Sequence, residues 1–494
     1  MKNIISIKRL VKLQKVDKHW SNMAFIFFIA LMCGFNLNVA HANDGHRIEV
    51  NVKNYTADYC FFTSYYGNKK YLIKDTLYRD DKGKYVIEGD EPLNPGLYAI
   101  LLPPQNIPFE LMISDEKDQK FTVETDTLNV IKNLKIKGSK ENQAFYEYLH
   151  FTGEKRQEIT DLQAEGEAEK NKKKKQKISD KIKALNGDIS QYQSDYISTH
   201  QGWLSTAMLK ASTDVKVPDP ATKMTEEEES MYRMNYYRKH YFDNLDFSDE
   251  RLLYSPVYFN KIDFYLKRLT YQIPDTLMQA TDFILDKARA NDKIYNYTLF
   301  EFISRYGNSK VVGMDAVFVH LVDKYVEGKT FGDNIDEKQI AKIVKTAKEF
   351  KPLLIGKKAP NITLQNHEGE NLALYDMDAE YTLLYFWDTE CGHCKKAAPL
   401  MVDFYNKYKE KGVEMYAVCT KDKNPQKCMD FIKEKDFDIW TNVLAMTDRQ
   451  LYYRLYYRIK STPVIYILDK DKNILMKNVG AKQLPDVMDA ILNK

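Results

Sequence analysis

The sequence predicts a multidomain chain of mixed α+β and α/β class, with a small antiparallel β domain, a helical middle domain and a C-terminal α/β domain. Its 494 residues exceed the size of one ordinary domain, and a chain of this length is expected to form about three. Alternating residues with frequent turns come first, a long stretch at helical spacing follows, and a strand–helix pattern ends the chain. We expect a leader over residues 1–42, the β domain over 43–140, the helical domain over 141–351 and the α/β domain over 352–494.

The first 42 residues have the features of a secretory signal peptide. A basic lead precedes an uncharged stretch, Met23–Ala40, and the small residues Ala40 and Ala42 stand where a signal peptidase cuts. Cleavage would leave a mature chain that begins near Asn43 in the periplasm or cell envelope. The alternative is an uncleaved membrane anchor, because the apolar stretch carries no charge.

Charge and cysteine content exclude two classes of protein. The formal charge is +3, and residues 1–42 hold six Lys or Arg against one Asp, so the remainder carries about −2. That balance gives no electrostatic case for nucleic-acid binding. The cysteines after the leader are too few for a disulfide-stapled scaffold and fit one redox pair with isolated thiols. They are Cys60, Cys391, Cys394, Cys419 and Cys428.

Residues 47–138 predict the β domain. Short alternating runs at 50–53, 59–62, 70–73 and 85–88 are typical of strands, and Gly, Asn, Asp and Pro clusters separate them. Cys60 falls in one of these strands and is expected to be a buried small hydrophobe.

Helical spacing dominates residues 142–351. One long polar helix is predicted over 154–197, and its lysine-rich block, Lys170–Lys177, is interpreted as a solvated or coiled-coil face rather than a nucleic-acid patch, because glutamates offset it. His240 and His320 are single histidines, expected to be packed or exposed rather than metal ligands. Further helices are predicted over 249–268, 275–291, 295–306 and 314–326.

The stretch 381–399 carries the chemistry. A short aromatic-rich run, Leu383–Trp387, predicts a buried strand, and Cys391 and Cys394 follow it at the start of a helix that is expected to reach about Lys411. The free N–H groups and positive dipole of a helix N-terminus favour a thiolate. The spacing also lets the two sulfurs close a small disulfide ring.

Several further motifs occur in a characteristic order. They are Gly356–Leu364, Gly369, Leu372–Leu374, Phe386-Trp387, Val413–Cys419 and Ser461–Asp469. With the cysteine pair, they resemble the thioredoxin superfamily, specifically its cell-envelope TlpA/ResA-like branch, over residues 354–494. Asp75-Thr76, Gly96-Leu-Tyr and the run from Ile136 to Gln143 resemble the N-terminal domain of unknown function that is often joined to this branch.

The resemblance implies a thioredoxin-like fold and thiol–disulfide exchange without a cofactor or metal. Cys391, on the exposed side of the motif, is expected to attack, and Cys394, one helical turn inside, to resolve the mixed disulfide. A structural disulfide or a zinc half-site is the alternative, but zinc needs four ligands and no second Cys/His pair is evident. Cys419 and Cys428 are expected to be two unconnected thiols, with a second, regulatory disulfide as the alternative.

Four residues around the pair are expected to tune it. Gly392 and His393 resemble the dipeptide of protein disulfide isomerases, and His393 is expected to donate to the Cys391 sulfur. Lys395 acts in the same direction and Glu390 against it. Most TlpA/ResA-like proteins have Trp at the position of Glu390, and a Glu where this chain has Ala397, so this chain lacks the side chain to which the resemblance assigns proton transfer.

Substrate contacts are expected at three residues. The resemblance implies that Pro463 forms a cis peptide bond and that the backbone of Thr462 pairs with an extended substrate segment. Trp387 is also expected to contribute to substrate binding.

The sequence therefore predicts an exported thiol–disulfide oxidoreductase that acts on protein thiols or disulfides of the cell envelope, with a membrane electron donor as a further partner. A redox-inactive envelope binding or scaffold protein is one alternative, and an apocytochrome thiol reductase in cytochrome c maturation is another. Substrate, direction of electron flow and oligomeric state are left open.

Overall fold

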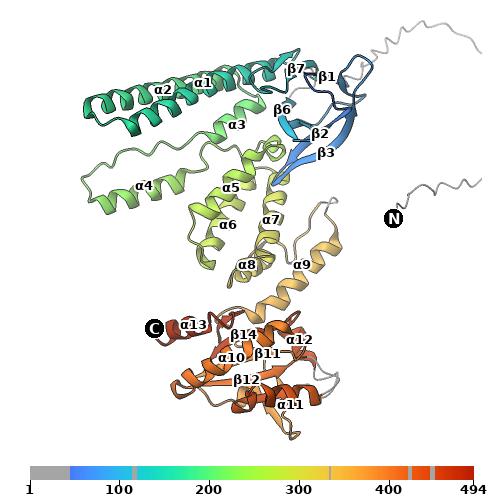
Figure 1. Ribbon diagram of the computed structural model, residues 1–494, viewed down its shortest axis with the longest axis vertical. Helices are drawn as coiled ribbons and strands as arrows, with labels where there is room; N and C mark the ends of the chain where they lie inside the picture. Colours follow the sequence, from blue (N-terminus) through green and yellow to red (C-terminus); the bar gives the residue numbers. More distant parts are fainter. Residues whose placement is uncertain (1–44, 114–118, 333–334, 421–424, 445–450, 494) are drawn as a thin grey trace, which may run out of the picture. The chain divides into compact units, whose positions relative to one another are not determined.

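The computed structural model describes residues 45–493, except for 114–118, 333–334, 421–424 and 445–450 (Figure 1). The predicted leader, residues 1–42, lies outside the described residues. From residue 45 onward the chain forms β sheets, then helices, then a further sheet with helices on it, as the sequence predicted.

Two four-stranded sheets make up the β segment, in the orders β4-β1-β7-β8 and β3-β2-β5-β6. Neighbouring strands are antiparallel except for β1 and β7, which pair in parallel. Apolar side chains of both sheets, among them Val50, Phe62 and Leu111, share one core, so the sheets form a sandwich. Cys60 is fully buried in that core, as expected. The strands are β1 (His46–Lys53), β2 (Tyr59–Tyr66), β3 (Lys69–Tyr78), β4 (Tyr85–Gly89), β5 (Gly96–Leu102), β6 (Ile107–Ile113), β7 (Lys120–Asp126) and β8 (Lys135–Lys137).

A helical hairpin, α1 (Lys140–Ala168) and α2 (Lys172–Thr199), follows the sandwich, and Figure 1 shows its two helices side by side. The prediction of a single helix over 154–197 is therefore wrong. Asn171 ends the turn, because its side chain accepts hydrogen bonds from the N–H groups of Lys173 and Lys174 and starts a new helix. A seam of isoleucines and leucines joins the two helices, and the side chains of 171–177 are exposed, as a solvated helix face requires.

The remaining helices of the middle segment surround one large core of aromatic and aliphatic side chains. The predicted helix over 249–268 is interrupted at Ser255, whose hydroxyl accepts from the N–H of Val257 and starts a helix with Pro256 at its first position. The elements are α3 (Leu204–Ser212), α4 (Glu226–His240), η2 (Glu250–Tyr254), α5 (Pro256–Arg268), α6 (Pro274–Ala288), α7 (Asp292–Gly307), α8 (Asp315–Tyr325), α9 (Glu337–Phe350) and η3 (Lys351–Leu353).

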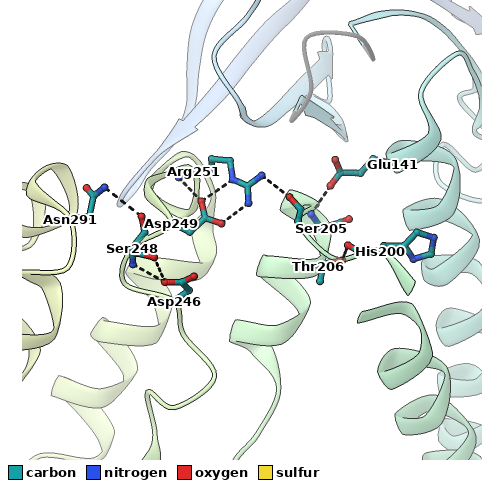
Figure 2. Close-up of polar contacts among 10 residues, drawn as sticks. Glu141, His200, Ser205, Thr206, Asp246, Ser248, Asp249, Arg251 and Asn291 are labelled. Atoms are coloured by element: carbon teal, nitrogen blue, oxygen red, sulfur yellow. Dashed lines mark hydrogen bonds and ion pairs between the residues drawn. The ribbon is translucent and has the colours of Figure 1, made fainter. Parts of the chain in front are cut away.

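Polar contacts connect the start of the hairpin with the helical core (Figure 2). The Glu141 carboxylate, only 2% exposed, accepts from the backbone N–H of Ser205 at 2.6 Å. Arg251 donates to the Asp249 carboxylate at 2.7 and 2.8 Å and to the carbonyl of Gly202 at 2.9 Å. Because a buried carboxylate needs hydrogen-bond donors, the contact of Glu141 with Ser205 fixes how α1 and α3 meet, and Arg251 fixes the loop before α3.

The C-terminal sheet has the order β10-β9-β13-β12-β11-β14-β15, with β11, β12 and β13 parallel. Side chains of β11 alternate between two cores, one under α10, α11 and α13 and the other on the opposite face. The strands are β9 (Thr363–Gln365), β10 (Asn371–Ala373), β11 (Tyr381–Trp387), β12 (Val413–Cys419), β13 (Thr441–Leu444), β14 (Val464–Asp469) and β15 (Ile474–Lys477); the helices are η4 (Leu374–Asp376), α10 (Gly392–Tyr408), η5 (Lys409–Lys411), α11 (Pro425–Glu434), η6 (Phe437–Ile439), α12 (Tyr453–Tyr456) and α13 (Leu484–Leu492).

Two basic side chains, Lys477 and Arg458, tie the C-terminal segment to the helical segment. Lys477, which is almost fully buried, pairs with Asp315 and donates to the carbonyl of Leu353. Arg458 pairs with Glu349 at 2.6 Å and lies over the ring of Phe350, 4.0 Å from its centroid. The predicted boundary at residue 352 falls within η3, and the contacts with Asp315, Glu349 and Phe350 cross it.

The edge of the sandwich is closed by the first helix. Strand β6 is an edge strand, and an edge strand leaves backbone groups unpaired. The buried side chain of Asn142 pairs with the backbone of Met112 in β6. It accepts a hydrogen bond from the Met112 N–H and donates one to the Met112 carbonyl, each at 2.8 Å. Tyr146 donates to the carbonyl of Glu110 at 2.6 Å. The start of α1 therefore takes the place of a fifth strand.

Asn142→Ala should lower the free energy of unfolding by about 2–4 kcal/mol, because it leaves two buried backbone groups without partners. Urea unfolding followed by circular dichroism measures the change. Asn186→Ala, at an exposed position of α2, is the matched control and should change stability by less than about 0.5 kcal/mol. Equal effects of the two substitutions would contradict the edge-closing role of Asn142.

Candidate functional site

The two cysteines lie where β11 gives way to α10. Cys391 is the N-cap residue of α10, and its sulfur accepts a hydrogen bond from the N–H of Cys394 at 3.2 Å. Cys391 is half-buried, whereas Cys394 is only 1% exposed and belongs to the core under the helix. One sulfur is therefore accessible and the other is sequestered one turn into the helix.

Strand pairing brings a distant loop to this pair. Strands β11 and β14 are antiparallel neighbours with Phe386 opposite Val464. The chain that leaves β11 therefore meets the chain that enters β14, and the Cys391 thiol donates to the carbonyl of Thr462 at 3.1 Å. The peptide bond between Thr462 and Pro463 is cis. Both residues are half-buried beside the sulfur.

The surroundings of Cys391 favour its thiolate. Burial raises the pKa, but the Cys394 thiol, the Thr462 hydroxyl and the backbone N–H groups of Cys394 and His393 lower it, and the net pKa lies below the ordinary value for cysteine. The two backbone donors are the free N–H groups expected at a helix N-terminus.

Cys394 has the opposite character. Burial and then the neighbouring Cys391 raise its pKa to about 12, although the Thr462 hydroxyl and the backbone of Asp388 lower it in part. The pair thus combines one accessible thiol that ionises more readily than an ordinary cysteine with one buried thiol that stays protonated at neutral pH. Thiol–disulfide exchange needs this combination, since the first sulfur attacks the substrate and the second later resolves the mixed disulfide.

The residues expected to tune the pair lie close to it but contribute unequally. His393 is exposed, and within the described part of the chain no contact joins its imidazole to the sulfur, so its backbone N–H is the group that acts. Glu390 pairs with Lys427 at 3.5 Å, and both side chains are 56% exposed, where water screens their charges. Gly392 and Lys395 are exposed on the first turn of α10.

Trp387 lies in the core rather than at the surface. It is fully buried, and its ring stacks on Phe431 of α11 with centroids 5.0 Å apart. The expectation of a substrate contact does not fit this position, because the side chain offers no surface to a partner. Strand alternation explains the difference: Trp387 shares the inner face of β11 with Leu383 and Tyr385.

Cys419 and Cys428 form a disulfide bond, so the prediction of two unconnected thiols is wrong. Cys419 ends β12 opposite Trp387, and Cys428 lies in the first turns of α11, which packs on the same face through Phe431. Both sulfurs point into one core, where they are at most 2% exposed. Neither thiol is therefore free to join Cys391 and Cys394 in a zinc site.

Asp388 is a residue of the site that the sequence analysis missed. Its carboxylate accepts from the N–H of Glu390 at 2.8 Å, and its carbonyl accepts from the N–H of Cys391 at 3.3 Å. This turn orients the loop between β11 and α10. An aspartate between a strand and a helix start is a turn signal that could have identified it.

Comparison with known protein families finds a match for each segment. Residues 355–477 match the AhpC/TSA family. Residues 46–145 and 164–349 match two domains of unknown function, DUF4369 and DUF5106.

Individual relatives align with the C-terminal segment. The thiol-disulfide oxidoreductase ResA of Bacillus cereus is 31% identical over 146 residues, which cover 28% of this chain and 78% of ResA. Among solved structures, the thioredoxin domain of a thiol-disulfide oxidoreductase from Bacteroides vulgatus is 28% identical, covering 28% of this chain and 96% of that one with a TM-score of 0.26. A thioredoxin-like protein from Bacteroides caccae is 18% identical and covers 56% of this chain and 99% of that one, with a TM-score of 0.41.

Two substitutions at one position separate the backbone from the imidazole. His393→Pro removes the N–H that lowers the pKa of Cys391, and the first turn of a helix tolerates proline. The pKa should rise, so that less thiolate is present at neutral pH and alkylation by iodoacetamide at pH 7 should slow by about tenfold. His393→Ala keeps the N–H and should leave the pH profile of alkylation close to that of the native protein. Equal shifts in both variants would assign the effect to the imidazole instead.

Proposed function

The chain belongs, through its C-terminal segment, to the ResA family of thiol–disulfide oxidoreductases, and from this premise we propose that it is an exported enzyme that exchanges disulfides with proteins of the cell envelope. The observation that carries the proposal is the asymmetry of the cysteine pair. Cys391 is accessible with a lowered pKa, and Cys394 is buried with a raised one.

The proposed exchange runs in two steps. In the reductive direction the Cys391 thiolate attacks one sulfur of a substrate disulfide, and the other substrate sulfur leaves as a thiolate. A mixed disulfide between Cys391 and the substrate results. Cys394 then attacks the Cys391 sulfur, the substrate leaves as a thiol that carries the proton of Cys394, and the Cys391–Cys394 disulfide forms. The reverse sequence oxidises a substrate dithiol.

Thr462 and Pro463 are the proposed substrate contacts. The Thr462 carbonyl lies 3.1 Å from the Cys391 sulfur, so a substrate cysteine bonded to Cys391 passes along this backbone. An extended substrate segment can pair with exposed backbone groups there, as a strand pairs with a sheet edge. Backbone recognition of this kind accepts many sequences, which suits an enzyme for protein disulfides.

Export is proposed from the basic lead and apolar stretch of residues 1–42, which precede Ala40-His41-Ala42. Within the residues that the structure describes, none of the helices is long and apolar enough to cross a membrane. The Cys419–Cys428 disulfide also supports an oxidising compartment.

The mature chain should begin near Asn43. N-terminal sequencing of the protein purified from an envelope fraction measures this directly. Recovery of the chain in the membrane fraction with Met1 intact would favour the anchor instead, and cytosolic protein with an intact N-terminus would contradict export.

The redox activity should depend on two cysteines of the chain. In an insulin-reduction assay with dithiothreitol as the electron source, Cys391→Ser should abolish the acceleration that the native protein gives, because no attacking sulfur remains. Cys394→Ser should form mixed disulfides that persist, visible as dithiothreitol-sensitive bands on non-reducing gels. Cys60→Ser is the control, since that thiol is buried in the sandwich, and should retain activity. Full activity of Cys391→Ser would leave the scaffold function as the better explanation.

A further inference from the structure

The inner face of β11 carries an unsatisfied hydroxyl beneath the cysteine pair. Tyr385 is fully buried, and within the described part of the chain its hydroxyl has no hydrogen-bond partner. A buried polar group without a partner destabilises the fold, and such groups are uncommon in folded proteins. Tyr385 differs from Tyr453, whose hydroxyl is also unpartnered, because it lies on the face of β11 that packs under the cysteine pair.

Tyr385 and Cys394 belong to the same core. Tyr385 lies on the face of β11 that packs under α10, and Cys394 projects from the first turn of α10 into that cluster. Burial, then the charge of a Cys394 thiolate, then that of Cys391, raise the pKa of Tyr385. The phenol therefore lies within electrostatic range of both sulfurs and stays protonated when a thiolate forms.

Resolution of the mixed disulfide requires charge on Cys394. This thiol is 1% exposed and has a pKa of about 12, so its thiolate forms in an apolar surrounding where an unpaired charge is costly. One turn further along α10 the chain has Ala397, which has no proton donor or acceptor in its side chain. The Thr462 hydroxyl and the backbone N–H of Asp388 act on this sulfur but offset its burial only in part, so a further donor from the sheet below the helix would favour the thiolate.

We propose that the Tyr385 hydroxyl donates a hydrogen bond to the Cys394 thiolate as it attacks Cys391, which makes Tyr385 a positioning and stabilising residue for the resolving step. The inference rests on the proposed function of the pair. Tyr385 keeps its proton throughout: the S–S bond from Cys391 to the substrate breaks, the bond from Cys391 to Cys394 forms, and the proton of Cys394 leaves with the substrate thiol.

Trp387 offers a second unpartnered donor on the same strand face, its indole Nε1. Its ring stacks on Phe431 of α11, so replacing it would disturb packing as well as hydrogen bonding. Tyr385 permits a cleaner test, because Tyr385→Phe removes one oxygen and keeps the ring.

The test uses the whole chain and the chromogenic reagent 5,5′-dithiobis(2-nitrobenzoate), which reports both steps in one experiment. Attack by Cys391 releases one thionitrobenzoate, and resolution by Cys394 releases the second. Tyr385→Phe should leave the rate of the first release unchanged. It should slow the second release by about 10- to 100-fold, the effect of one hydrogen bond to a charged atom.

Tyr453→Phe is the matched control. The Tyr453 hydroxyl is also buried and without a partner in the described part of the chain, but the side chain lies in the core on the opposite face of the sheet. Both releases should keep their native rates in this variant. Site-specific 3-fluorotyrosine at position 385 retains the hydroxyl and should restore the second release, which a packing defect in Tyr385→Phe would not predict.

The outcomes distinguish the inference from the function on which it rests. A native rate for the second release in Tyr385→Phe overturns the inference and leaves the exchange activity in place. A native protein that releases no thionitrobenzoate through Cys391 overturns the proposed function itself. Slowing of the second release to the same extent in Tyr453→Phe would assign the effect to general packing and also overturn the inference.

Discussion

The pairing of β11 with β14 is the constraint on which the redox site depends. The two strands run antiparallel with Phe386 opposite Val464, so the loop that leads to Cys391 and the loop that ends at Pro463 leave the sheet side by side. A slip of one residue in this register would exchange the faces of β11. It would turn Tyr385 and Trp387 away from α10 and carry the Thr462 carbonyl away from the sulfur.

The same strand divides the C-terminal segment into two different environments. On the α10 face lie both sulfur pairs, the buried Trp387 and the unpartnered hydroxyl of Tyr385. On the other face Phe386 packs among Tyr453, Tyr457 and Tyr466. Redox chemistry is thus confined to one side of the sheet, and a tightly packed aromatic layer supports it from the other.

Sequence reasoning succeeded where the signal was local. The order of β, helical and α/β segments followed from periodicity, and the position of Cys391 and Cys394 at a helix start followed from a strand and a helix adjacent in sequence. It failed where the outcome depended on packing. The break between α1 and α2 contains neither Gly nor Pro, so only the apolar seam between the helices reveals the hairpin. The bond between Cys419 and Cys428 requires α11 to lie on the Trp387 face, and no short motif encodes that contact.

The buried Cys419–Cys428 bond means that this protein must itself be oxidised at one cysteine pair before it can exchange disulfides through another. Four cysteines in one segment can pair in three ways, and only the pairing of Cys419 with Cys428 leaves Cys391 and Cys394 free to cycle together. Once the fold closes over it, this bond is at most 2% exposed, so it is shielded from thiols in solution. We therefore expect the Cys419–Cys428 disulfide to form before folding is complete, which leaves Cys391 and Cys394 available for exchange.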